Sequence, residues 1–341
     1  MRKAKVIKIA NLSLRLLIIG ATLWYLYDQL IASEKFQTLS ELLAERLNDT
    51  KHLGIILLAI ILMPVNLFLE TVKWQFQIRK LEKVKLNKAF TAVLSGISVS
   101  MFMPNRVGDY LGRVFILEKA SHIKGVLLTM IGSLAQLLVT LVIGGVALLF
   151  FLPMTDYFSA NNQWLYSAVL VLILVLLSAG VFIYFNINLL YVIVKSLFPS
   201  KSKVILPYIE VFNYFTHKQL AYILGLSVLR YGVFSLQFIL FLWAFELPLT
   251  YSEAIMLVGV SYLFITLIPT VALSELGVRG SVSIFLFSIW FQSQQLVFDG
   301  FEVGVFAASS AVWLVNIVVP ALLGVFFVYR LKFFRRENGK S

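Results

Sequence analysis

The sequence contains no cysteine, which excludes disulfide bridges, cysteine metal sites and thiol catalysis. Its three histidines, His52, His122 and His217, stand apart, and none has a second metal ligand at helical spacing. The patterns HExxH, DxD and GxxxxGK[ST] are also absent. We therefore expect no metal site, no cofactor and no bound nucleotide. Any energy for an activity must then come from a gradient, a partner or downhill movement.

Charged residues are scarce. They make up 13% of the 341 residues, against 60% hydrophobic residues, which lies outside the usual range of soluble globular proteins. Apolar runs of about 20 residues, the length that a helix needs to cross a bilayer core, recur along the chain. The predicted full crossings are 12–30, 53–72, 125–152, 164–190, 220–245 and 303–329. Because no small-x-small cleavage site follows the first run, we expect a retained span rather than a signal peptide.

The basic residues are unevenly distributed. Twenty Lys and Arg lie in 1–8, 79–88, 119–124, 195–218 and 330–340, and three lie in the loop 31–51. Because cytoplasmic loops carry an excess of basic residues, this bias predicts a protein of the bacterial cytoplasmic (inner) membrane with both termini in the cytoplasm. We expect the basic rims to attract anionic lipid rather than nucleic acid.

Two further apolar segments, 89–103 and 254–268, are too short to cross the membrane. Each holds 15 residues, or about 22 Å of helix, against a hydrocarbon core of about 30 Å. Each is followed by a proline (Pro104 or Pro269), then by charged residues and a second short apolar arm. We therefore predict two re-entrant helical hairpins, at 89–118 and 254–291, whose tips are buried in protein or line a wet cavity.

The two hairpins look like copies of each other. After each proline come an acidic residue and an arginine four positions later, with a glycine between them: Asp109, Gly112 and Arg113 in the first, Glu275, Gly277 and Arg279 in the second. Three crossings separate equivalent elements, so the halves 1–152 and 153–341 are inverted relative to one another. The predicted fold is therefore an all-α polytopic membrane protein with six transmembrane helices, two re-entrant hairpins and an inverted internal repeat, which is a transporter architecture.

Ionisable residues within apolar stretches mark the candidate site, because a charge at mid-membrane normally faces a partner or a cavity. Arg230 contacts an anion or pairs with a carboxylate of the site. The acid–arginine pairs at i,i+4 share a helix face; they neutralise each other, or they help an anion to dock at the helix N-terminus beyond the proline. The candidate binding residues are Arg113, Asp109, Arg106, Asn105, Arg230, Glu275, Arg279 and Glu70; Pro104, Gly108, Gly112, Pro269 and Gly277 shape the hairpins.

The segments "FMPNRVGDYLGR" (102–113) and "SELGVRGS" (274–281) resemble the transmembrane region of lysylphosphatidylglycerol synthases, the flippase-like half of the multiple peptide resistance factor. This resemblance, which spans about 12–329, implies a domain that moves an aminoacylated or similar anionic phospholipid between leaflets. It also implies that Asp109, Arg113, Glu275 and Arg279 line the head-group cavity. Full synthases carry a soluble aminoacyl-transfer domain after the last span, whereas "RLKFFRRENGKS" follows here, so we do not expect this chain to charge a lipid with an amino acid.

Three hypotheses remain open at this point. The first is a flippase-like transporter of a phospholipid or a lipid-linked precursor. The second is a membrane-embedded lipid-modifying enzyme, which the lack of a catalytic motif disfavours. The third is a non-catalytic subunit of a lipid or glycan synthesis complex, with a synthesis enzyme or a second copy of the chain as its partner.

Overall fold

A computed structural model gives the fold, which within the described residues consists of helices, turns and loops without a β-strand. It describes residues 48–101, 103, 106–155, 163–197, 205–270, 272–296, 300–329 and 331, with only the backbone of 272–274, and single positions between residues 9 and 46. The α-helices are α3 (Thr50–Ile78), α4 (Leu86–Ser100), α5 (Val107–Val114), α6 (His122–Phe151), α7 (Gln163–Phe185), α8 (Leu189–Leu197), α10 (His217–Ala244), α11 (Tyr251–Leu267), α12 (Ala272–Ser293), α13 (Phe301–Trp313) and α14 (Val319–Val328). Short 3-10 segments lie at Leu152–Met154 and Glu210–Tyr214, and a π-helical turn, η6 (Leu314–Val318), joins α13 to α14.

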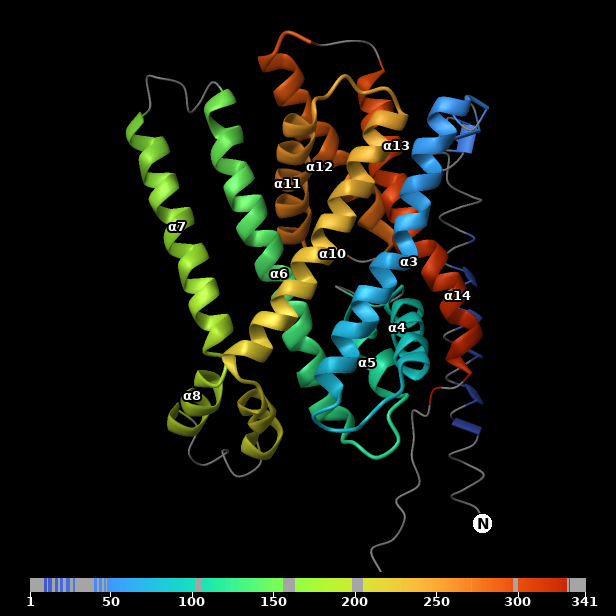
Figure 1. The fold of residues 1–341 in the computed structure, drawn as a ribbon, viewed down its shortest axis with the longest axis vertical. Helices are drawn as coiled ribbons and strands as arrows, with labels where there is room; N and C mark the ends of the chain where they lie inside the picture. The colour runs from blue at the N-terminus through green and yellow to red at the C-terminus, as the bar shows by residue number, and fades with distance from the viewer. Residues whose placement is uncertain are drawn as a thin grey trace, which may run out of the picture.

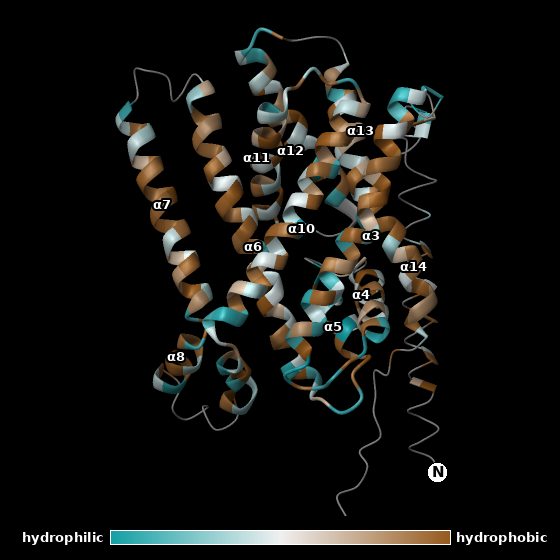
Figure 2. Cartoon of the chain, in the orientation of Figure 1, coloured by the Kyte–Doolittle hydropathy of each residue, from teal (hydrophilic) through white to brown (hydrophobic). Residues whose placement is uncertain are grey.

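Long apolar helices dominate the structure (Figures 1 and 2). In the described part of the chain, five stretches are long and apolar enough to cross a membrane: Thr50–Ile78, His122–Met154, Gln163–Phe185, His217–Ala244 and Phe301–Val328. They coincide with five of the six predicted crossings. The predicted crossing 12–30 lies largely outside the described residues, although its described positions are helical. Large apolar side chains such as Ile61 and Phe182 are exposed on these helices, as lipid contact requires, and the chain is a multi-pass membrane protein.

Local sequence signals explain several helix boundaries. Thr216 and Thr250 each open a helix, α10 and α11, with a capping box. Pro320 lacks the N–H that would bond to the carbonyl four residues earlier, and the helix widens into the π-helical turn η6 just before it. Such turns occur often at functional sites, and this one carries the buried Asn316.

Two pairs of helices at the positions of the predicted hairpins occupy opposite halves of the molecule, α4–α5 in the lower half of Figure 1 and α11–α12 in the upper half. We call them the short pairs after their first helices, α4 with 15 residues and α11 with 17. The α4–α5 pair begins and ends at the same end. The carboxylate of Glu82, before α4, accepts hydrogen bonds of 2.7–3.1 Å from the backbone N–H groups of residues 118–120, after α5. Lys88, near the start of α4, also lies 3.2 Å from the carboxylate of Glu118. The chain therefore turns back on itself within this pair.

Glycines of α5 allow its backbone to contact the backbone of α4. A Cβ at Gly112 would lie 2.7 Å from the Cα of Gly96, and one at Gly108 would clash with the carbonyl oxygen of Val99. No side chain fits in either space. This contact places the polar face of α5, with Asp109 and Arg113, toward the interior.

The structure differs from the expectation in two details. The span predicted at 164–190 ends at Phe185, where a turn at 186–188 intervenes before α8; the side chain of Asn186 bonds back to the carbonyl of Phe182 there. The second arm of the second pair is also not short: α12 has 22 residues, against 8 in α5, and ends two residues beyond the predicted bound 291. The apolar sequence after Arg279 continues the helix to Ser293.

Candidate functional site

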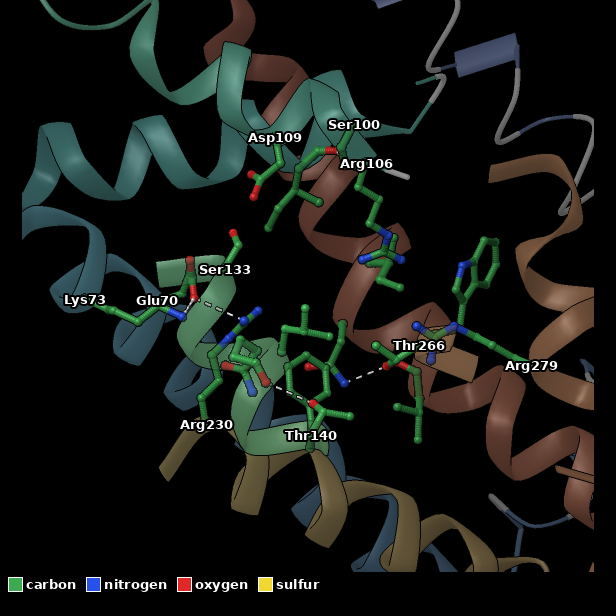
Figure 3. A pocket seen from close by; sticks show the side chains of 18 of the residues that line it. Glu70, Lys73, Ser100, Arg106, Asp109, Ser133, Thr140, Arg230, Thr266 and Arg279 are labelled. Carbon is green, nitrogen blue, oxygen red and sulfur yellow. Dashed lines mark hydrogen bonds and ion pairs between the residues drawn. The ribbon is translucent and has the colours of Figure 1, made fainter. Parts of the chain in front are cut away.

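A cavity of about 320 Å³ lies between the two short helix pairs and the long helices around them. Its lining comes from α3, α4, α5, α6, α10, α11, α12, α13 and η6. Figure 3 shows Glu70, Lys73 and Arg230 on one side of it, and Arg106 and Arg279 on the other. The charged residues that line it are Glu70, Lys73, Arg106, Asp109, Arg113, Arg230 and Arg279.

On the side of the cavity formed by Glu70, Lys73 and Arg230, the carboxylate of Glu70 on α3 pairs with three cations. Its Oε1 lies 2.5 Å from Nη1 of Arg113, and its Oε2 lies 2.8 Å from Nζ of Lys73 and 3.1 Å from Nη1 of Arg230. Glu70, Lys73 and Arg113 are each at most 5% exposed, and a buried charge without a partner is costly. One carboxylate thus connects α3, α5 and α10.

Asp109 and Arg113 form the expected i,i+4 pair on α5. Arg113 donates from Nε to Oδ1 of Asp109 at 2.8 Å and from Nη2 to Oδ2 at 2.6 Å, which is a bidentate arrangement. Its third nitrogen bonds to Glu70. Every guanidinium nitrogen of Arg113 thus has a carboxylate partner. In this structure Asp109 and Arg113 neutralise each other.

The other acid–arginine pair joins the two helix pairs. Glu275 and Arg279 lie one turn apart on α12, with Nε of Arg279 donating to Oε1 of Glu275 at 3.0 Å. The same oxygen lies 2.5 Å from Nη2 of Arg106, the residue that precedes α5. Arg106 has φ 55°, in the left-handed region that a non-glycine residue adopts only at a cost. A strained backbone position thus carries the ion pair that connects the start of α5 to α12.

The cluster carries a surplus of positive charge. Among the described residues, five cations (Lys73, Arg106, Arg113, Arg230 and Arg279) face three carboxylates (Glu70, Asp109 and Glu275), which leaves a formal charge of +2. Among the described residues, Arg279 bonds to Glu275 through Nε alone, and its two terminal nitrogens have no other partner there. Within the same described part of the chain, Nη2 of Arg230 has no partner, whereas Nε bonds to Asn66 and Nη1 to Glu70.

Uncharged side chains hold Arg230 in place. Its Nε donates to Oδ1 of Asn66 at 2.8 Å, and Nδ2 of Asn66 donates to Oδ1 of Asn316 at 2.8 Å. Nδ2 of Asn316 in turn donates to Oε1 of Gln237, whose amide reaches the carbonyl of Ala59 at 2.9 Å. Asn66, Asn316 and Gln237 therefore form one chain of hydrogen bonds that links α3, η6 and α10 to Arg230.

Six of the eight predicted binding residues line the cavity: Glu70, Arg106, Asp109, Arg113, Arg230 and Arg279. A seventh, Glu275, is not in the lining but pairs with Arg106 and Arg279. Pro104 and Asn105 lie outside the described residues. Pro269 is exposed in the link between α11 and α12, and Gly277 lies within α12. Lys73 is not among the predicted binding residues; it is 2% exposed, pairs with Glu70 and lines the cavity. The i,i+3 spacing from Glu70 was the only sequence signal for it.

The comparisons with known proteins agree with this architecture. The family described as "Lysylphosphatidylglycerol synthase TM region" matches residues 12–298, well over half of the chain. A search of curated proteins and a search of solved structures gave no match. The chain therefore belongs to the lysylphosphatidylglycerol synthase transmembrane-region family, and its role concerns membrane lipids.

Proposed function

From this family membership and the cationic cavity, we propose that the chain is a flippase-like transporter, and not an enzyme, that moves an anionic phospholipid between the leaflets of the bacterial cytoplasmic membrane. The observation that carries the proposal is the surplus of two positive charges around a cavity that the ends of both short helix pairs adjoin. A phosphodiester supplies the missing negative charge. Its acyl chains remain in the bilayer while the head group passes through the protein.

The two short pairs supply the path. We interpret them as re-entrant hairpins in an inverted arrangement, with the basic end of the molecule (79–88 and 119–124) in the cytoplasm. In this interpretation the ion pair between Arg106 and Glu275 lies near mid-membrane, where each hairpin closes the cavity toward one face. Motion of one hairpin relative to the other then exposes the cavity to each leaflet in turn.

In this proposal the head group interacts first with arginine donors that have no partner among the described residues. The terminal nitrogens of Arg279 and Nη2 of Arg230 are placed to bind phosphate oxygens, as arginine does well through its fixed fork of N–H groups. A phosphate that competes with Glu275 for Arg106 weakens the ion pair that links the two helix pairs. Binding of a phosphate at Arg106 would therefore lower the free-energy cost of separating the two helix pairs.

A vesicle assay tests the proposal. The purified chain is reconstituted into vesicles that contain fluorescent phosphatidylglycerol, and dithionite reduces the probe that reaches the outer leaflet. We expect the wild-type chain to expose the inner-leaflet probe. The variant Arg279→Gln should slow this movement by about tenfold or more, because one charge-assisted hydrogen bond contributes roughly 1.5–3 kcal/mol.

Arg46→Gln is the matched control. Nη1 of Arg46 lies 2.7 Å from Oε2 of Glu246, and neither residue lines the cavity. This variant should move lipid at the wild-type rate. A wild-type chain that leaves the probe in its original leaflet contradicts the transport function. Undiminished movement in Arg279→Gln contradicts the assignment of the site.

A further inference from the structure

A second cavity, of about 560 Å³, lies at the basic end of the molecule, where α3 ends and α10 begins. It shares no lining residue with the central cavity. Its lining is Val72, Gln75, Phe76, Arg79, Lys80, Lys83, Val84 and Tyr222; we call it the basic groove. Because Arg79 directly follows the membrane-spanning helix α3, the basic groove lies at the level of the membrane surface.

The described lining of the basic groove contains three cations, Arg79, Lys80 and Lys83, and no acidic residue. Glu82 lies in the same loop but is engaged elsewhere, since its carboxylate accepts hydrogen bonds from residues 118–120 and lies 3.6 Å from Nζ of Lys88. The charge of the three cations is therefore not balanced within the groove.

Aromatic and apolar side chains form the inner wall. The rings of Phe76 and Tyr222 lie 4.7 Å apart between centroids, and the guanidinium of Arg79 lies 3.9 Å from the Phe76 ring centroid. The side chain of Gln75 donates to the carbonyl of Val84 at 2.8 Å, which holds the loop in place beside the helix. The groove is thus a concave surface in which three cations lie beside the apolar side chains of Val72, Phe76 and Val84 and the ring of Tyr222.

We propose that the basic groove binds the phosphate of an anionic phospholipid in the leaflet at this end of the molecule. The cations contact the phosphate, and Val72, Phe76 and Tyr222 pack against the glycerol and the first acyl carbons. Lipid from the bilayer fits this chemistry better than free phosphate, because the groove combines cations with apolar walls at the end of a membrane span. Binding here does not depend on whether the lipid later crosses the membrane.

A local fluorescence probe tests the groove without reporting on the central cavity. The chain has no cysteine, so Leu86→Cys, at an exposed position close in sequence to Val84, accepts a single bimane label. The labelled full chain is placed in phosphatidylcholine nanodiscs that contain a small fraction of phosphatidylglycerol with a nitroxide near its head group. We expect stronger quenching than with nitroxide-labelled phosphatidylcholine at the same fraction.

The groove variant Arg79→Gln/Lys80→Gln/Lys83→Gln should weaken the apparent affinity for labelled phosphatidylglycerol by about tenfold or more, since each basic residue near the surface contributes roughly 1 kcal/mol. The matched control Lys119→Gln/Lys124→Gln/Lys195→Gln loses the same charge outside the groove lining and should keep the excess quenching. Equal loss in both variants, or no excess in the wild type, overturns the proposal. If inorganic phosphate at the concentration of the lipid phosphate abolishes the excess, the occupant is a soluble phosphate and the lipid assignment is wrong.

Discussion

At the scale of single residues, the site depends on the ion pairs of one carboxylate, that of Glu70. Glu70 contacts Arg113, Lys73 and Arg230, so it compensates cations that come from three helices. Removal of one member of a buried ionic group leaves uncompensated charge, which typically costs about 3–5 kcal/mol. Glu70 therefore has a structural role as well as a place in the cavity lining.

We expect Glu70→Gln, which keeps the shape of the side chain, to lower the thermal unfolding midpoint of the purified chain clearly. The reason is that Lys73 and Arg113 then remain buried with one carboxylate fewer. The control Glu302→Gln removes a carboxylate from an exposed position of α13 and should change the midpoint little. The same midpoint in both variants would show that Glu70 does not stabilise the cluster.

The sequence predicts most of these residues, because a charge in an apolar stretch is conspicuous. It does not predict their partners. The hydrogen bond between Arg106 and Glu275 joins residues 169 positions apart. The left-handed backbone of Arg106 could not be predicted either, because arginine rarely adopts that conformation. The predicted crossing 53–72 ends just before Lys73, because hydropathy alone does not show that α3 continues to Ile78.

At the scale of helices, close contact between α4 and α5 places the polar residues of α5. We expect Gly112→Ala to destabilise the chain by about 1–3 kcal/mol, because the new methyl group meets the backbone of residues 95 and 96, which cannot move aside as a side chain can. The thermal unfolding midpoint of the purified protein measures this.

Gly225→Ala on α10 is the matched control, since a Cβ there meets nothing within 4 Å. It should leave the midpoint unchanged or raise it, because alanine favours a helix over glycine by roughly 1 kcal/mol. If the two alanine variants have equal stability, the glycine contact does not hold the pair together.

A second element-scale prediction concerns the link at the base of this pair. Burial of Glu82 acts to raise the pKa of its carboxyl, but hydrogen bonds from the backbone amides of Lys119, Glu118 and Ala120 outweigh it and hold that pKa below the ordinary value of 4.5. The stabilisation is therefore present at neutral pH and is lost as the pH falls below about 4.5 toward the folded-state pKa. Glu82→Gln should unfold at a lower temperature than the wild type at pH 7, and this difference should disappear in acid. A difference that does not change with pH would exclude the charge of Glu82 as its source.

At this scale the sequence predicts the existence of both short pairs, because a 15-residue apolar segment before a proline cannot cross a bilayer. The predicted bounds, 89–118 and 254–291, make the second arm of the second pair the longer one, and α12 continues to Ser293. The sequence does not show that α5 has only 8 residues. The π-helical turn at η6 likewise has no sequence signal beyond Pro320.

At the scale of the whole molecule, long helices enclose a polar interior that none of them forms alone. The cavity takes charged residues from α3, α5, α10 and α12, which belong to both predicted halves, 1–152 and 153–341. Five of the predicted crossings could be found from the sequence because hydropathy acts along the chain; the re-entrant topology stays a prediction. The convergence of the halves on one cavity depends on packing between distant segments, which a single sequence does not encode in a readable pattern.

The proposed topology, in which the two short pairs dip into the bilayer from opposite faces, can be measured by single-cysteine labelling in intact inverted and right-side-out vesicles. Asn87→Cys and Lys119→Cys flank α4–α5, and Ser252→Cys and Gln294→Cys flank α11–α12, all at exposed positions. We expect a membrane-impermeant maleimide to label positions 87 and 119 from one side and positions 252 and 294 from the other. Labelling of 87 and 119 from different sides would contradict it.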